Sequence, residues 1–331
     1  MADKIIRFIK EWFLVIGMTV GVLAYLAYDA LPSIHAYGPV LHRVCKIVQP
    51  LLLFVMLFLS FCKVRPSELK PHRWQFWLLL IQSLSFIGIA LLVCWADSSS
   101  GNVAAFINNI RQPLEAAMLC LICPTATACA VMTGKLGGNV AEVVTYTIII
   151  NFAVAILIPL FVPLVHPDTA ATFLDAFLKI LYKVFPLLIL PFIAAMAVRF
   201  LLPRLHSWLV SKSDLAFYIW GISLTLAITM STREIMHSSN GLAVILETAL
   251  ASLLACIFQF AAGRAIGRRY GCEISASQAL GQKNTVFAIW VGYTFLTPAV
   301  SVAGGFYSIW HNVYNSWQLH RHQKRSHQTR S

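Results

Sequence analysis

Residues 140–164 read VAEVVTYTIIINFAVAILIPLFVPL, an apolar run whose one charged residue is Glu142. A helix needs about 20 apolar residues to cross the hydrocarbon core of a bilayer, so this run is long enough. Similar runs recur along the 331 residues, and 59% of the chain is apolar while only 11% is charged. Soluble domains carry about 25% charged residues. The sequence therefore predicts an all-α integral membrane protein and excludes a soluble enzyme, a disordered chain and a disulfide-stapled secreted domain.

Ten apolar segments are identified as transmembrane helices: residues 12–30, 44–62, 74–96, 114–132, 140–164, 173–202, 215–231, 242–262, 274–296 and 299–317. Most of the lysines and arginines lie at alternate ends of these segments, beginning with Lys4, Arg7 and Lys10. By the positive-inside rule, both termini then lie in the cytoplasm. We expect a multi-pass protein of a bacterial inner membrane. Because these flanks explain the net charge of +12, we expect no nucleic-acid partner.

The ten segments divide into two sets of five, within residues 1–164 and 165–319, and residues 320–331 form a basic cytoplasmic tail. Because five is odd, two halves of the same fold must be inverted relative to one another. Inverted repeats of this kind are a common architecture of secondary transporters. The sequence thus predicts ten transmembrane helices in two inverted five-helix repeats.

The fourth segment of each half contains an interruption. Residues 121–129 read LICPTATAC and residues 277–285 read SQALGQKNT. Proline removes a backbone hydrogen bond and glycine weakens a helix, and in lipid such backbone is tolerated only where it is buried in protein or lines a cavity. Matching interruptions predict a transport site between the halves. The alternative is that Pro124 only kinks its helix and that the second stretch is a polar packing face.

Lys283 lies near the middle of the ninth segment, too far from either end for its side chain to reach water. A lysine there costs about 2.5–3.5 kcal/mol on insertion scales, so we expect it to face a cavity or a partner. Glu247, in the eighth segment, is a candidate partner or proton carrier. A buried structural ion pair between the two is the alternative.

Three motifs resemble those of the bile acid:sodium symporter family: residues 123–129 (CPTATAC) with the helix that follows, residues 281–284 (GQKN) and residues 307–312 (YSIWHN). The resemblance covers residues 32–317. It implies ten helices arranged as a core domain and a panel domain, with the broken fourth and ninth helices crossing in the core. It also implies sodium-coupled import of organic anions such as bile acids, pantoate or other small carboxylates.

The resemblance also locates the sodium-binding positions of the family, which here hold mostly other residues. They are Gln82, Cys129, Ala130, Val143, Thr147, Ala279 and Lys283. Alanine stands where the family has a carboxylate and lysine where it has a ligand glutamine. Alanine offers sodium no side-chain oxygen, and an ammonium group repels the ion. We therefore expect no metal and no cofactor, although the resemblance implies sodium.

Family positions that line the substrate cavity correspond to Thr127, Asn284, His311 and Asn312. Hydroxyl, amide and imidazole groups can all donate hydrogen bonds to a carboxylate. Half-helix N-termini that point into the same cavity would add positive potential. For His311 and Asn312 the alternative role is hydrogen bonding between helices.

The sequence therefore predicts a secondary transporter of small organic anions, bile-acid-like or other carboxylates, that works by alternating access and for which transport without sodium is one option. A non-transporting membrane sensor or scaffold derived from a transporter is the alternative. We expect no enzyme, because the spans contain neither an HExxH motif nor a pair of carboxylates, and the chain has no GxxxxGK[ST] loop. The expected partners are a small organic anion and the lipid bilayer; the sequence does not reveal the oligomeric state.

Overall fold

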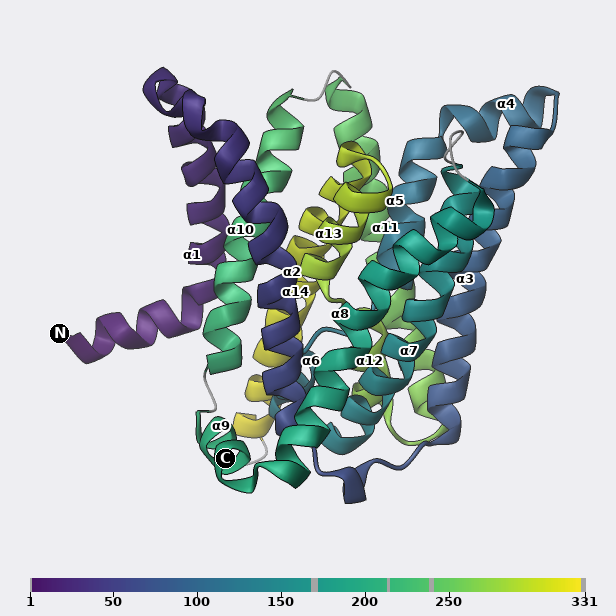
Figure 1. The fold of residues 1–331 in the computed structure, drawn as a ribbon. Coiled ribbons are helices and arrows are strands. Elements are labelled where there is room, and N and C mark those ends of the chain that lie inside the picture. Colours follow the sequence, from purple (N-terminus) through teal and green to yellow (C-terminus); the bar gives the residue numbers. More distant parts are fainter. Residues whose placement is uncertain (1, 168–171, 213–214, 238–240, 329–331) are drawn as a thin grey trace.

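The structure is a computed structural model that describes residues 2–167, 172–212, 215–237 and 241–328, with the side chains of residues 1–15 and of a few other positions left out. Every regular element in these ranges is a helix (Figure 1). The long helices are α1 (Ala2–Ala30), α2 (Gly38–Cys62), α3 (Arg73–Ser98), α7 (Val140–Val165), α8 (Phe173–Leu201), α10 (Leu215–His237), α11 (Leu242–Arg269) and α14 (Pro298–Gln328). The short helices are η1 (Pro32–Tyr37), η2 (Pro66–Glu68), α4 (Asn102–Asn109) and α9 (Pro203–Ser211).

Two of the predicted segments are broken helices. The fourth consists of α5 (Arg111–Ile122) and α6 (Cys129–Lys135), and the ninth consists of α12 (Glu273–Gly281) and α13 (Thr285–Phe295). Each of the other eight predicted segments coincides with one long helix. Among the described residues, five helices are long and apolar enough to cross a membrane: Pro32–Cys62, Arg73–Ser98, Val140–Val165, Phe173–Leu201 and Leu242–Arg269. The prediction of an all-helical membrane protein is confirmed.

We name two sets of helices the first and the second group; the two sets pack on each other through α7 and α8 and through α10 and α14. The first contains α1, α2, α8 and α10, where α1 packs on α10, and α2 packs on both α8 and α10. The second contains α3, α5, α6, α7 and α11 to α14, with α11 against α5, α12 and α14. In Figure 1 the helices α1, α2 and α10 stand on one side, whereas α3, α5 and α11 stand on the other.

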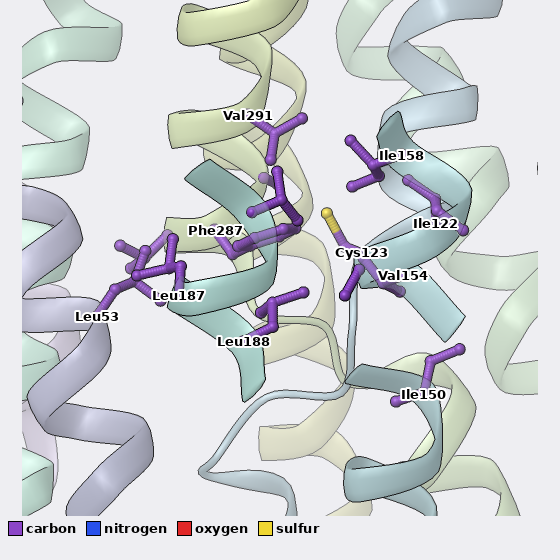
Figure 2. Close-up of a cluster of buried hydrophobic side chains, with 14 of the residues drawn as sticks. Leu53, Ile122, Cys123, Ile150, Val154, Ile158, Leu187, Leu188, Phe287 and Val291 are labelled. Atoms are coloured by element: carbon purple, nitrogen blue, oxygen red, sulfur yellow. The ribbon is translucent and has the colours of Figure 1, made fainter. Parts of the chain in front are cut away.

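The two groups meet in an apolar cluster beside the first interruption (Figure 2). Leu53 on α2 and Leu188 on α8 come from the first group, while Phe287 on α13, Val154 on α7 and Cys123 come from the second. Each of these residues is fully buried or nearly so. Because lipid tails are as apolar as leucine, close packing rather than the hydrophobic effect holds such helices together.

Close packing of α11 on α12 depends on two glycines one turn apart. A Cβ atom at Gly263 would lie 2.5 Å from the carbonyl oxygen of Ala276, and one at Gly267 would lie 2.6 Å from Cα of Glu273. Residues 263–267 thus form a GxxxG motif, which lets two helix backbones approach in a membrane. This contact fixes the half-helix that leads to Lys283.

Candidate functional site: the crossing of the two broken helices

The two interruptions meet inside the second group as an antiparallel bridge between Thr125 and Lys283. The backbone N–H of Ala126 donates to the carbonyl of Gln282 at 2.8 Å, and that of Asn284 donates to the carbonyl of Pro124 at 2.9 Å. These bonds replace helical bonds that the interruptions lack, as buried backbone in a membrane requires. We call this region the crossing.

Local chemistry explains where each helix breaks. Cys123 is extended, with φ −50° and ψ 136°, as the residue before a proline prefers, so α5 ends at Ile122. Gly281 ends α12 where a Cβ atom would lie 2.4 Å from the ring of Phe260, so no larger residue fits. The side chain of Asn284 then caps α13 by accepting a bond from the N–H of Phe287 at 3.1 Å.

Lys283 is buried at the crossing, with 1% of its surface exposed. Its Nζ atom has no hydrogen-bond partner among the described residues. The titratable groups that interact with it electrostatically are the thiols of Cys120, Cys123 and Cys129. Glu247, the candidate partner or proton carrier, is exposed on α11, and the described residues show no bond between it and Lys283.

Two of the four predicted substrate residues, Thr127 and Asn284, lie on the interruptions, and the other two, His311 and Asn312, lie on α14. Thr127 is half-buried in the turn before α6, and Asn284 is buried with Nδ2 unpaired. His311, on α14, is buried with both ring nitrogens unpaired, one turn after Tyr307, which donates to the carbonyl of Gly281 at 2.7 Å. Asn312 is half-buried and donates to the carbonyl of Ser308 in its own helix at 2.8 Å. Lys283, Asn284 and His311 thus combine burial with unpaired nitrogen atoms.

At the positions that the resemblance assigns to sodium, the side chains offer few oxygen atoms, and those present already make hydrogen bonds. The carbonyl of Ala279 accepts a bond from the hydroxyl of Thr125 at 2.7 Å. Cys129 supplies sulfur, 3.9 Å from the hydroxyl of Thr133, and the hydroxyl of Thr147 donates within its own helix. Ala130 and Val143 have no side-chain oxygen. Gln82 keeps its amide, but Tyr146 donates to its oxygen at 2.9 Å.

Three buried residues at the crossing were missed by the sequence analysis as functional residues: Tyr146, Gln259 and Tyr307. Tyr307 begins the YSIWHN motif but was given no role of its own, and nothing in the sequence marks Tyr146 or Gln259, because a tyrosine or glutamine in an apolar helix fits a packing role equally well. Gln259 Nε2 donates to the hydroxyl of Tyr307 at 3.0 Å, and these two residues are 48 positions apart in the sequence. Only the folded chain brings them together.

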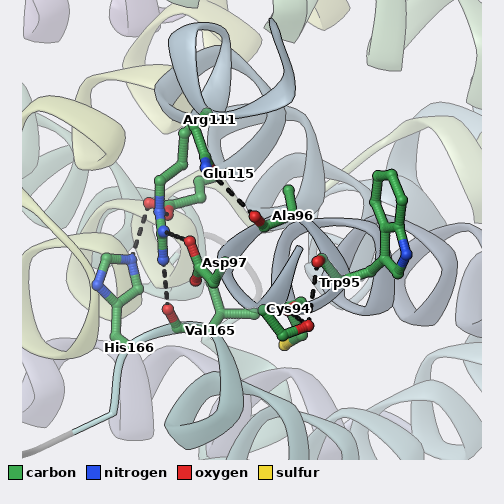
Figure 3. Close-up of polar contacts among 10 residues, drawn as sticks. Cys94, Trp95, Ala96, Asp97, Arg111, Glu115, Val165 and His166 are labelled. Carbon is green, nitrogen blue, oxygen red and sulfur yellow. Dashed lines mark hydrogen bonds and ion pairs between the residues drawn. The ribbon is translucent and has the colours of Figure 1, made fainter. Parts of the chain in front are cut away.

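A second polar cluster, also missed, lies at the ends of α3, α5 and α7 (Figure 3). Arg111 donates to Glu115 at 2.7 Å, to Asp97 at 2.6 Å and to the carbonyl of Val165 at 2.6 Å. His166 lies 2.8 Å from the other oxygen of Glu115. The cluster fastens the start of α5 and so helps to hold the crossing in place.

No curated protein matches the chain. Residues 50–245, more than half of the chain, match the family described as the Sodium Bile acid symporter family. The matched range contains the first interruption but ends before α12, so the second interruption and the crossing are properties of the structure described above. The predicted resemblance is confirmed. The chain belongs to the sodium bile acid symporter family, a family of membrane transporters of organic anions.

Proposed function

We propose that this protein is a secondary transporter that carries small organic anions by alternating access and that it does so without sodium. The observation that carries the proposal is the crossing, where Lys283 is buried and has neither a hydrogen-bond partner nor an acidic neighbour among the described residues. An uncompensated charge inside a membrane protein is costly, and a bound carboxylate would supply its missing partner.

The groups beside Lys283 also suit an anion. Asn284 Nδ2 and the ring of His311 offer unpaired donors, and both side chains are buried. Asn284 is also the cap of α13, so the positive end of that helix dipole lies at the crossing. Thr127 adds a hydroxyl on the first interruption. A carboxylate can accept hydrogen bonds from amide, imidazole and amine donors at once.

The arrangement of helices supports ten crossings in two inverted repeats. In chain order, α1 to α7 and α8 to α14 each contain one broken helix, and the two interruptions pair with each other. The first group then acts as the panel domain and the second group as the core domain. The C-terminal end of α14 lies at the same end of the bundle as α9, opposite α4, which suits a basic cytoplasmic end (Figure 1). We propose a bacterial inner membrane with both termini in the cytoplasm.

The proposal is tested by thermal unfolding of the purified protein with small carboxylates and bile acids, in sodium and in potassium buffer. We expect at least one carboxylate to raise the melting temperature, equally in the two buffers. At 100 times its Kd, a ligand stabilises the folded state by about 2.7 kcal/mol. Stabilisation that requires sodium contradicts the proposal. Binding without uptake in proteoliposomes would favour the sensor alternative instead.

A further inference from the structure

A glutamine and a tyrosine from different helices form a buried pair in the first half of the chain. The hydroxyl of Tyr146 on α7 donates to Gln82 Oε1 on α3 at 2.9 Å. Gln82 Nε2 in turn donates to the carbonyls of Ile122 at 3.1 Å and Cys123 at 2.9 Å. These two carbonyls lie at the C-terminal end of α5. The pair therefore ties the broken helix to the long helices that precede and follow it.

The second half of the chain contains the same arrangement. Gln259 on α11 donates to the hydroxyl of Tyr307 on α14 at 3.0 Å, and that hydroxyl donates to the carbonyl of Gly281 at the end of α12 at 2.7 Å. Gln259 Nε2 also reaches the carbonyl of Cys120 at 3.3 Å, so this pair touches both broken helices. In each half the glutamine lies on the long helix before the broken one, and the tyrosine lies on the helix after it.

Both pairs meet a need that any broken helix in a membrane creates. The last carbonyls of a helix have no partner within it, and the C-terminal end carries about half a negative charge. Here the C-terminal ends of α5 and α12 meet at the crossing. In transporters with broken helices, such ends commonly bind a sodium ion or a proton.

We infer that the two glutamine–tyrosine pairs hold the open ends of α5 and α12 in place of a bound cation, which makes Gln82, Tyr146, Gln259 and Tyr307 positioning residues for the anion site. Their N–H and O–H groups donate to the carbonyls that an ion would otherwise bind. The statement that no cation is bound there rests on the proposed function. The hydrogen bonds themselves do not depend on that function.

Both polar atoms of the Gln82 side chain make hydrogen bonds within the protein. A cation beside this side chain would need the oxygen Oε1, and one of the two lone pairs of that oxygen already accepts the hydroxyl of Tyr146. The amide nitrogen is turned to the carbonyls of α5, where a cation would be drawn by the negative helix end. Lys283 interacts electrostatically with the thiol of Cys123, at the end of the same broken helix.

The native cysteines report directly on the crossing. Cys120 and Cys123 are buried there, and Cys62, equally buried on α2, lies in the first group and reports global unfolding. Alkylation of the full chain by N-ethylmaleimide, without any anion, is followed at each cysteine by mass spectrometry. We expect Tyr307→Phe to speed labelling of Cys120 and Cys123 about tenfold, with Cys62 unchanged. Equal rates in the variant and the unmodified protein would overturn the inference.

Control variants that remove a hydroxyl elsewhere show whether the labelling rates respond to the bonds with the broken helices or to any loss of a hydroxyl. Tyr314→Phe makes the same change on α14, where the ring packs on Phe260 and has no hydrogen bond among the described contacts. Thr145→Val is the control for Tyr146→Phe, because the hydroxyl of Thr145 bonds only within α7. We expect neither control to change the labelling rates. Gln259→Met, which keeps the length but not the donors, replaces Tyr307→Phe if that variant does not fold.

The effect of sodium on cysteine labelling tests whether the glutamine–tyrosine pairs take the place of a bound cation. Labelling of the unmodified protein is expected to be the same in sodium and in potassium. The double variant Tyr146→Phe with Lys283→Gln frees the oxygen of Gln82 and removes the amine, so sodium should now slow labelling of Cys123. Sodium protection of the unmodified protein, or none in the double variant, overturns the inference. Since no anion is present, failure of anion binding would refute the proposed function without touching this result.

Discussion

Lys283 and Glu247 show how different two charged residues within predicted spans can be. Glu247 faces outward from α11, while Lys283 lies at the crossing with no acid beside it. Both follow one sequence rule, that an ionisable residue in a span marks function by default. The structure supports a functional role for the lysine by its burial and its unpaired Nζ. A residue that is costly for folding and lacks a structural partner is a candidate for ligand binding.

Lys283→Gln is expected to weaken anion binding by about 1.5–3 kcal/mol, the range for hydrogen bonds to charged groups. The melting temperature of the free protein should stay the same or rise, because the substitution removes a buried charge that has no partner. Binding and thermal unfolding are measured in the same buffer. Lys179→Gln on the exposed face of α8 is the control. A loss of stability with unchanged affinity would assign the lysine to folding instead.

Cys272 gives a pH-dependent prediction outside the spans. It lies between α11 and α12, where burial, and then the nearby carboxylate of Glu142, raise the pKa of its thiol to about 11. Only the thiolate reacts with alkylating reagents, so the labelling rate should rise about tenfold per pH unit up to that pKa. Removing the negative charge favours the thiolate, so Glu142→Gln should speed labelling at pH 8. A rate that levels off near pH 9 would contradict the raised pKa.

Single proline and glycine residues decide where the long helices break and how closely they pack. Pro124 and Gly281 break two helices, and the GxxxG motif at Gly263 and Gly267 lets α12 lie against α11. The backbone bonds between Ala126 and Gln282 then join the breaks. A helix that is interrupted in mid-membrane therefore needs neighbouring backbone to bond the N–H and C=O groups at its break.

Gly263→Val is expected to destabilise the protein by about 1–3 kcal/mol, the range for overpacking. The added Cβ atom would lie 2.5 Å from the carbonyl oxygen of Ala276, which is backbone and cannot move aside alone. Thermal unfolding in detergent measures the loss. Gly88→Ala on α3 is the control, since a Cβ atom there meets nothing within 4 Å. Equal melting temperatures for the two variants would show that the α11–α12 contact is loose.

At the scale of the whole molecule, the crossing lies within the second group, and Phe287 on α13 packs in the cluster shared with the first. Cys123 belongs to the same cluster, so movement of one group against the other would alter the surroundings of the first interruption. The proposed transport cycle uses this contact, because alternating access is commonly a movement of one bundle against another around a fixed site.

Cysteines introduced at Thr127 and Asn284 test whether the two interruptions form one site. In membrane vesicles, a water-borne thiol reagent should reach both positions from the same side, because the backbones of the two interruptions pair. A carboxylate that stabilises the protein should protect both. Ser67→Cys, exposed on the short helix η2 between α2 and α3, should label without protection. Reaction from opposite sides, or protection of only one position, would contradict a shared site.

The sequence by itself determined the class of the protein and the elements that matter. The long apolar runs predict helices that cross lipid, because backbone groups in a bilayer have no water to bind. Pro124 and the stretch around Lys283 also located both interruptions, since these residues disrupt a helix locally. The resemblance to the family rested on motifs that are short and contiguous, and the match of residues 50–245 then showed the membership. All of these signals lie within a turn or two of the residues they concern.

Only the tertiary structure decided which side chains meet. The partners of Gln82 and Gln259 lie between 40 and 139 residues away along the chain, and no local pattern encodes such distances. The exposed position of Glu247 was equally hidden, because it depends on how α11 is rotated against α5, α12 and α14. Helix rotation and pairing arise from close packing of many side chains at once, and that packing exists only in the folded chain.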